Sequence, residues 1–249
     1  MTCFAWENFQ FMSSLPISEI VAGGAFATAG ALAWSAFAPS SQVFGPTIRQ
    51  TGDGATLALT FDDGPNPLVT PKLLDLLYRY DAKASFFLIG GHVRKALAIA
   101  KEIKSRGHTI GNHTETHPSL VFLPPRRVQE ELDHCDDAIA SATGEKPEIM
   151  RPPFGFRSPL LDGIIRRRRM KGVVMWSAKA WDWKPQPAER VIHRLRRVRG
   201  GDIVLLHDGD HRKSEGERMH VVAALEYWLP RWKEAGLRFV TMDEVIAKS

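Results

Sequence analysis

The feature that most constrains this chain is a regular exchange of strand-like and helix-like segments that begins after Gly54. The stretch ATLALTF alternates like a strand, and the following TPKLLDLLYRY carries apolar residues at helical spacing. The same exchange repeats as far as the strand-like LRFVT and a last helix, which Thr241 and Glu244 open as a capping box. Strands that alternate with helices over about 190 residues predict a parallel sheet covered by helices.

The sequence also predicts where several helices begin and end. Thr70 followed by Pro71 predicts an N-cap and a first helical residue. The periodic stretch 92–107 predicts one helix that ends at Gly107, and the long helix that starts at residue 125 is expected to close at Gly144.

Unusual polar or aromatic side chains follow the ends of several predicted strands. They are Asp62, Asp63, Arg151, Trp176 and His207. Collecting such groups at the carboxyl ends of strands is typical of barrel enzymes. We therefore predict an α/β fold with a barrel-like domain over residues 55–249, and the number of strands stays open.

Size and charge exclude few classes of protein or partner. The 249 residues are 44% hydrophobic, which is enough for a full core, and the net charge of +5 does not identify a nucleic-acid partner. We expect a monomer that binds no nucleic acid. Cys3 and Cys135 are too few for a disulfide scaffold. The basic run from Arg166 to Lys171 reads either as the solvated end of a helix or as a contact with an anionic polymer or a membrane surface.

The first 54 residues differ in kind from the rest. After an N-terminal segment, residues 1–19, the stretch 20–38 is uncharged and close to the length of a membrane-spanning helix. We interpret it as a membrane anchor, with a cleaved signal and a cytosolic or mis-started segment as alternatives, because residues 1–19 carry no Lys or Arg. Residues 39–54 are expected to be a linker. The expected location is the cell envelope, anchored or exported, and a cytoplasmic location stays open.

The segment TFDDGP ends an apolar run with two carboxylates and then breaks it with Gly64 and Pro65. Alone it is ordinary turn chemistry. Successive side chains of a strand point to opposite sides, so Asp62 and Asp63 are expected to have separate tasks.

The segment HTETH places His113 and His117 four residues apart. On a helical turn this spacing would bring both imidazoles to one ion. A metalloprotease helix needs Glu directly after the first His, where this chain has Thr114. Together with one aspartate, two histidines predict a catalytic divalent site that keeps open positions, and the second aspartate is left as a base.

Three further segments carry chemistry, namely RPPFG at 151–155, WDW at 181–183 and IVLLHDG at 203–209. A rigid Pro-Pro step can fix the directions of Arg151 and of the Phe154 backbone. In this order with TFDDGP and HTETH, the segments resemble the five motifs of the polysaccharide deacetylase family, the NodB-like carbohydrate esterases. The resemblance covers roughly residues 55–245.

The resemblance implies a distorted (β/α) barrel and a metal-dependent hydrolase that removes acetyl groups from amino sugars of chitin-type oligomers or peptidoglycan, and in some members from acetylated xylan. It implies three metal ligands and one base. These are Asp63, His113 and His117 as ligands and Asp62 as the general base. Zinc is the expected ion, although cobalt, nickel or iron would suit the same donors.

The resemblance also implies roles for the other motif residues. Arg151 would orient Asp62, and Asp182 would orient His207, the general acid. The Phe154 N–H would face the oxyanion, Leu205 would line the acetyl pocket, and Trp183 would contact the sugar.

The chain departs from the family at two positions, with Lys179 where the fourth motif often has an acid and with Phe154 where Tyr is common. Two other functions stay open, hydrolysis of another amide or O-acetyl ester and a catalytically silent carbohydrate-binding module.

Overall fold

The computed structural model describes residues 28, 30, 31 and 33–248 of the chain. Eight parallel strands form one curled sheet in the order β1-β6-β5-β4-β3-β2-β8-β7, and β9 pairs with the start of β2. The strands are β1 (Thr47–Ile48), β2 (Thr56–Gly64), β3 (Ala84–Leu88), β4 (Thr109–Asn112), β5 (Ile149–Met150), β6 (Gly172–Val174), β7 (Ala178–Lys179), β8 (Ile203–His207) and β9 (Arg238–Phe239).

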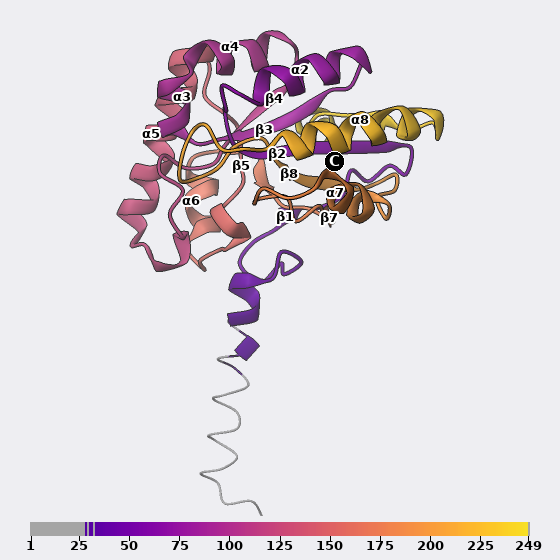
Figure 1. Cartoon of the computed structure of the whole chain (residues 1–249). Helices are drawn as coiled ribbons and strands as arrows, with labels where there is room; N and C mark the ends of the chain where they lie inside the picture. The colour runs from indigo at the N-terminus through magenta and orange to yellow at the C-terminus, as the bar shows by residue number, and fades with distance from the viewer. Residues whose placement is uncertain (1–27, 29, 32, 249) are drawn as a thin grey trace, which may run out of the picture.

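Helices cover the outside of this curl (Figure 1). They are α2 (Thr70–Arg79), α3 (Gly90–Lys95), α4 (Leu97–Ser105), α5 (Pro125–Thr143), α6 (Leu161–Arg167), α7 (Ala188–Leu195), α8 (Met219–Glu234) and α9 (Met242–Ala247). Among the described residues β1 and β7 do not pair with each other, so the curl stays open between them. The predicted α/β fold of the distorted-barrel type is confirmed.

The central strand β2 shows why the sheet is parallel and covered. All nine of its residues are buried, which is the pattern of a strand with both faces packed. Leu57, Leu59 and Phe61 enter the largest core cluster, which also takes side chains from α2, β3, α4, α5 and α8. Cys135 of α5 is buried in the same cluster, where its thiol donates to the Leu88 carbonyl oxygen, and burial raises its pKa. Cys135 is therefore a packed core residue.

Most of the expected helix ends are present, and two differ. Gly144 closes α5 in a left-handed conformation, and Thr241 with Glu244 caps α9. Thr70 is the first residue of α2 rather than its cap, because its hydroxyl accepts the Asn66 N–H and donates to the Asp208 carboxylate. The single helix predicted over 92–107 is wrong, since the chain breaks at Ala96 between α3 and α4.

The residues before β2 are tied to the domain. Thr47 and Ile48, within the predicted linker 39–54, pair with β6 as strand β1. Farther upstream, residues 33–37 are helical, and the Phe37 ring meets the Phe156 ring edge to face at 4.7 Å. Buried Arg157 donates to the carbonyl oxygens of Ala38 and Ser41.

Most of the predicted anchor, 20–38, lies outside the described residues, as does all of segment 1–19. Within the described part of the chain, no helix is long and apolar enough to cross a bilayer.

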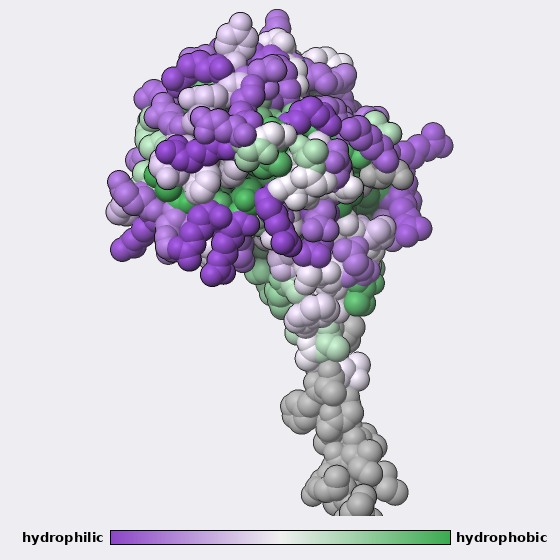
Figure 2. All heavy atoms as spheres, turned by 90° about the vertical axis from the view of Figure 1, so that its right-hand side faces the viewer, coloured by the Kyte–Doolittle hydropathy of each residue, from purple (hydrophilic) through white to green (hydrophobic). Residues whose placement is uncertain are grey.

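Polar side chains dominate the face of the domain drawn in Figure 2, and the described N-terminal residues below it are paler and more apolar.

The basic run at the end of α6 is partly neutralised. Arg166 pairs with Asp162 at 2.9 Å, and Arg168 reaches the carboxylates of Asp133 and Asp136.

Candidate active site and metal centre

The two aspartates lie at the carboxyl end of β2, where the ladder to β3 is irregular. Asp62 pairs with Phe87 and Gly64 pairs with Leu88, so Asp63 is the extra residue of a bulge, and its φ is +70°. The bulge cancels the opposite orientation expected of neighbouring strand residues. Both carboxylates therefore lie near one imidazole, with His113 Nε2 at 3.8 Å from Asp62 Oδ2 and 3.4 Å from Asp63 Oδ1.

The two motif histidines lie on a loop after β4 and not on a helical turn, so the reason first given for their closeness is wrong. Thr114 and His117 both have positive φ, which folds the loop back on itself. The Thr114 hydroxyl accepts the His117 N–H at 3.0 Å, and the Asn112 side chain accepts the Thr114 N–H at 2.7 Å. This local turn brings the ring centroids of His113 and His117 to 4.9 Å.

Asp63, His113 and His117 form the candidate metal-ligand set. The Nε2 atoms of the two histidines lie 3.4 Å and 3.3 Å from Asp63 Oδ1. Two donors on a tetrahedral ion with bonds of about 2.0–2.1 Å stand about 3.3 Å apart. Buried Asp63 Oδ1 has no hydrogen-bond donor among the described residues, although such an oxygen normally needs one. The residues present therefore fit a divalent cation.

The protonation states agree with that fit. Burial alone would raise the pKa of Asp63, but the side chains of His113 and His211 overcome this and hold it well below its usual value. Burial, aided by the neighbouring His113, lowers the pKa of His117 to about 3. An ionised carboxylate and a neutral imidazole are the forms that bind metal. His113 Nδ1, 2.7 Å from the Arg151 carbonyl oxygen, donates to it and leaves Nε2 free.

Asp62 is held by Arg151, which is completely buried beneath it. The guanidinium donates to Asp62 Oδ1 at 2.7 Å and to the Thr60 hydroxyl at 2.8 Å, and it stacks over the Phe87 ring at 4.3 Å. Two further bonds to main-chain carbonyl oxygens fix the group in place. Asp62 thus has one oxygen committed to Arg151 and the other turned towards His113.

On the other side of the site, His207 ends β8 and pairs with Asp182. The Asp182 carboxylate accepts the His207 backbone N–H at 2.7 Å and lies 3.1 Å from His207 Nδ1. Burial lowers the pKa of His207, but the pair with Asp182 outweighs it, and the pKa rises to about 9. Asp182 is itself anchored, because His220 Nε2 lies 2.9 Å from its carbonyl oxygen.

Aromatic and apolar side chains frame these polar groups. Phe154, 48% exposed, meets the His117 ring edge to face at 4.6 Å, and half-exposed Trp183 meets the His207 ring at 6.4 Å. Leu205 lies one layer below His207 on β8, within a core cluster that includes Trp176. The structure therefore gathers at one end of the sheet the ten residues to which the resemblance gives a role.

Left-handed backbone is concentrated at this end of the sheet. Within the described part of the chain seven non-glycine residues have positive φ, and five of them belong to the motif segments, namely Asp63, Thr114, His117, Phe154 and Trp181. Such conformations carry strain and persist only where the surroundings enforce them. The side-chain directions of the site are thus set by the tertiary structure.

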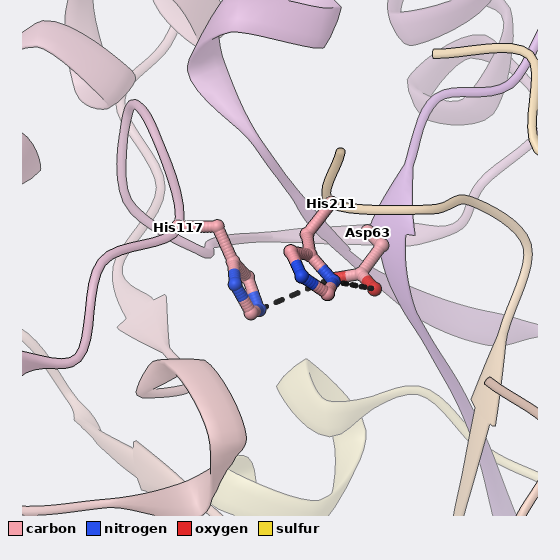
Figure 3. A group of neighbouring side chains, drawn as sticks. All are labelled: Asp63, His117 and His211. Atoms are coloured by element: carbon pink, nitrogen blue, oxygen red, sulfur yellow. Dashed lines mark ion pairs between the residues drawn. The ribbon is translucent and has the colours of Figure 1, made fainter. Parts of the chain in front are cut away.

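Two histidines here were missed by sequence reasoning. His211 Nδ1 lies 3.9 Å from Asp63 Oδ2, and its ring stacks on His117 at 4.6 Å (Figure 3). Buried His92 places Nδ1 2.9 Å from the Asp63 carbonyl oxygen. Neither belongs to a motif. The only signal for His211 was its position four residues after His207, the same spacing as in HTETH.

Lys179, which stands in place of an acid, has a different contact. Its ammonium lies 3.8 Å over the Trp181 ring. Partial burial lowers its pKa. The substitution therefore replaces a carboxylate with a cation–π contact on the outer side of the WDW segment.

Comparison with known proteins agrees with the resemblance found in the sequence motifs. The sequence model of the family described as polysaccharide deacetylase matches residues 49–173. The chain is 35% identical to a peptidoglycan-N-acetylglucosamine deacetylase of Bacillus cereus over 198 residues, which cover 76% of this chain and 87% of the relative.

It is also 35% identical to a chitooligosaccharide deacetylase of a Bradyrhizobium species over 197 residues, 75% of this chain and 89% of the relative. A crystal structure of a peptidoglycan N-acetylglucosamine deacetylase superposes with a TM-score of 0.72 at 32% identity, covering 79% of this chain and 92% of that one. The fold similarity thus extends over nearly the whole length of that deacetylase.

Proposed function

The chain belongs to the polysaccharide deacetylase family, and from this premise we propose that it is a metal-dependent hydrolase that removes acetyl groups from N-acetylated amino sugars of a glycan. The observation that carries the proposal is that the Nε2 atoms of His113 and His117 both lie within 3.4 Å of Asp63 Oδ1, with Asp62 beside them. His207 and Asp182 supply the second proton-transfer group that amide hydrolysis needs.

Asp63, His113 and His117 are the residues that would hold the ion. A bound divalent cation supplies a Lewis acid that polarises a carbonyl group and increases the acidity of water. The assignment is supported by donor spacings that match a tetrahedral ion and by the ionised Asp63 beside neutral His117.

Asp62 is the proposed general base. The Arg151 guanidinium binds Oδ1 and thereby points Oδ2 towards the site, where it can take a proton from the attacking water. Because Arg151 is buried and makes four hydrogen bonds, this orientation is fixed before substrate arrives. The two adjacent aspartates thus have different tasks.

His207 is the proposed general acid. A departing amine needs a proton, and a pKa of about 9 keeps the imidazole protonated at neutral pH. Asp182 holds Nδ1, which leaves Nε2 to donate. The Phe154 N–H is the proposed donor to the oxyanion, where losing one donor typically costs about 3 kcal/mol.

For the substrate, the exposed rings of Phe154 and Trp183 beside the polar groups suit the faces of sugar rings. Leu205 is proposed to contact the acetyl methyl group. The relatives are named for peptidoglycan and for chitooligosaccharides, so we propose a glycan with N-acetylglucosamine units and an envelope or exported location. Zinc is the proposed ion because two histidines and one aspartate suit it.

The experiment measures acetate release from chito-oligomers, peptidoglycan and acetylated xylan, with and without a chelator. Acetate from either N-acetylated glycan, lost on chelation and restored by added zinc, is the expected result. Release from acetylated xylan alone would replace amide hydrolysis with ester hydrolysis. No release from any of them, by a protein that still binds these glycans after chelation, would favour a silent binding module.

A further inference from the structure

The loop that follows β8 brings a third imidazole to Asp63. Gly209 makes the approach possible, because its N–H donates to the Asp62 carbonyl oxygen at 3.3 Å and a Cβ there would lie 1.9 Å from the Asp63 carbonyl oxygen. Only glycine can pass at this distance. Two residues later, His211 turns its ring back over the carboxylate (Figure 3).

The loop is held on both sides of His211. The Asp210 carboxylate accepts the Arg212 backbone N–H at 2.9 Å and the guanidinium of buried Arg218 at 3.1 Å. Farther along, the Asn66 side chain donates to the Gly216 carbonyl oxygen at 2.7 Å. These bonds fix the backbone on both sides of His211.

The His211 ring has the neighbours of a metal ligand. Its Nδ1 lies 3.9 Å from Asp63 Oδ2. One ligand atom from each of Asp63, His117 and His211 can be chosen so that all lie within 4.8 Å of one another. The ring stacks on His117 with planes 21° apart and meets the Phe154 ring edge to face, so it is confined on two sides.

We propose that His211 is a fourth protein ligand of the divalent ion held by Asp63, His113 and His117. The inference rests on the proposed function only for the presence of that ion. Catalytic sites of this type usually have three protein ligands and an open position. Here a fourth donor from an exposed loop would hold the ion more firmly when no substrate is bound.

The test measures ion binding directly. The purified metal-depleted protein is titrated with Zn²⁺ against a chromogenic chelator, and with Co²⁺ while the visible spectrum is recorded. His211→Ala is expected to weaken Zn²⁺ binding by at least about 10–100-fold, the range for losing a residue that only supports a ligand. It is also expected to change the Co²⁺ spectrum, because one nitrogen donor is lost.

Two control variants match this one. Ser214→Ala alters the same loop without removing a donor, and His134→Ala removes an exposed imidazole on α5. Both are expected to bind Zn²⁺ like the wild type. His211→Asp, which keeps an ionisable donor, is expected to recover part of the lost affinity.

Two results would overturn the proposal. Wild-type Zn²⁺ affinity in His211→Ala would exclude ligation, and weaker binding with an unchanged Co²⁺ spectrum would reduce His211 to a group that acts through Asp63. In both cases His117→Ala would still lose the ion, and the proposed hydrolase would stand. Absence of ion binding by the wild type would instead contradict the proposed function itself.

Discussion

The site contains two histidine–aspartate groupings whose surroundings drive their pKa values in opposite directions. His117, at the metal-ligand set, has its pKa lowered to about 3 by burial and by a second imidazole, whereas His207 has its pKa raised to about 9 because Asp182 outweighs burial. Both side chains are largely buried. The difference is in the carboxylate, since Asp63 is shared among several imidazoles and Asp182 serves one.

This contrast distinguishes the proposed metal ligand from the proposed general acid. A neutral imidazole offers a lone pair to a metal, and a protonated one offers a proton. The residue type is the same and the burial is similar in both places, so neither decides the role. The number and kind of charged neighbours does.

The largest expected effect comes from breaking the metal-ligand set. His117→Ala removes one of the converging donors, so the protein should lose its ion and its acetate release should fall to that of the chelated wild type. Metal content by elemental analysis and acetate release check this. His134→Ala is the control for loss of a histidine, and a His117→Ala protein with full ion content would contradict the ligand assignment.

Asp62→Asn should leave the ion bound and lose turnover. The amide can still accept from Arg151, so the fold around it is kept, but it cannot take a proton from water. We expect a rate loss of about 10²–10⁴-fold, the usual contribution of a general base. Wild-type turnover at full ion content would refute the base role and leave the metal-ligand set intact.

Asp182→Asn should change the pH dependence of kcat/KM, whereas kcat/KM at low pH should change little. With Asp182, the pKa of His207 is about 9, so the acid form persists as pH rises and is lost only as pH passes that value. Without that charge the pKa should fall to about 6.5, and the protonated fraction at pH 8 should drop about 30-fold. The check is the pH profile of kcat/KM.

At pH 5.5 the deficit of Asp182→Asn should be much smaller, because the imidazole is largely protonated in both proteins. Circular dichroism at both pH values controls for folding. An equal deficit at both pH values would mean that Asp182 acts by orientation and not through the charge of His207.

The smallest effect is expected at Lys179, beside the WDW segment that carries Asp182. Lys179→Met removes the ammonium over Trp181, a contact worth about 0.5–1 kcal/mol at exposed sites. The corresponding change in kcat/KM is at most about 5-fold, with the ion content and the pH profile unchanged. A shift in the alkaline limb of the pH profile would show that Lys179 also influences the pKa of His207. The contrast between the two histidine–aspartate groupings attributes that pKa to Asp182 and burial.

The sequence alone determined the class of fold and the motif residues of the site. Strand and helix periods are local properties, so alternation over residues 55–245 was enough to predict a parallel sheet, and the carboxyl ends of its strands were enough to predict where the polar groups meet. The ordered motifs identified the residues that the structure brings together.

Only the tertiary structure decided how those residues are arranged. The bulge at Asp63 forms in the ladder to β3, and the loop that carries His113 and His117 is hydrogen-bonded to Gly90, Gly91 and Glu131. His211 reaches Asp63 because Gly209 allows two backbones to touch. Side-chain direction and pKa are set by neighbours distant in sequence, and no local pattern encodes them.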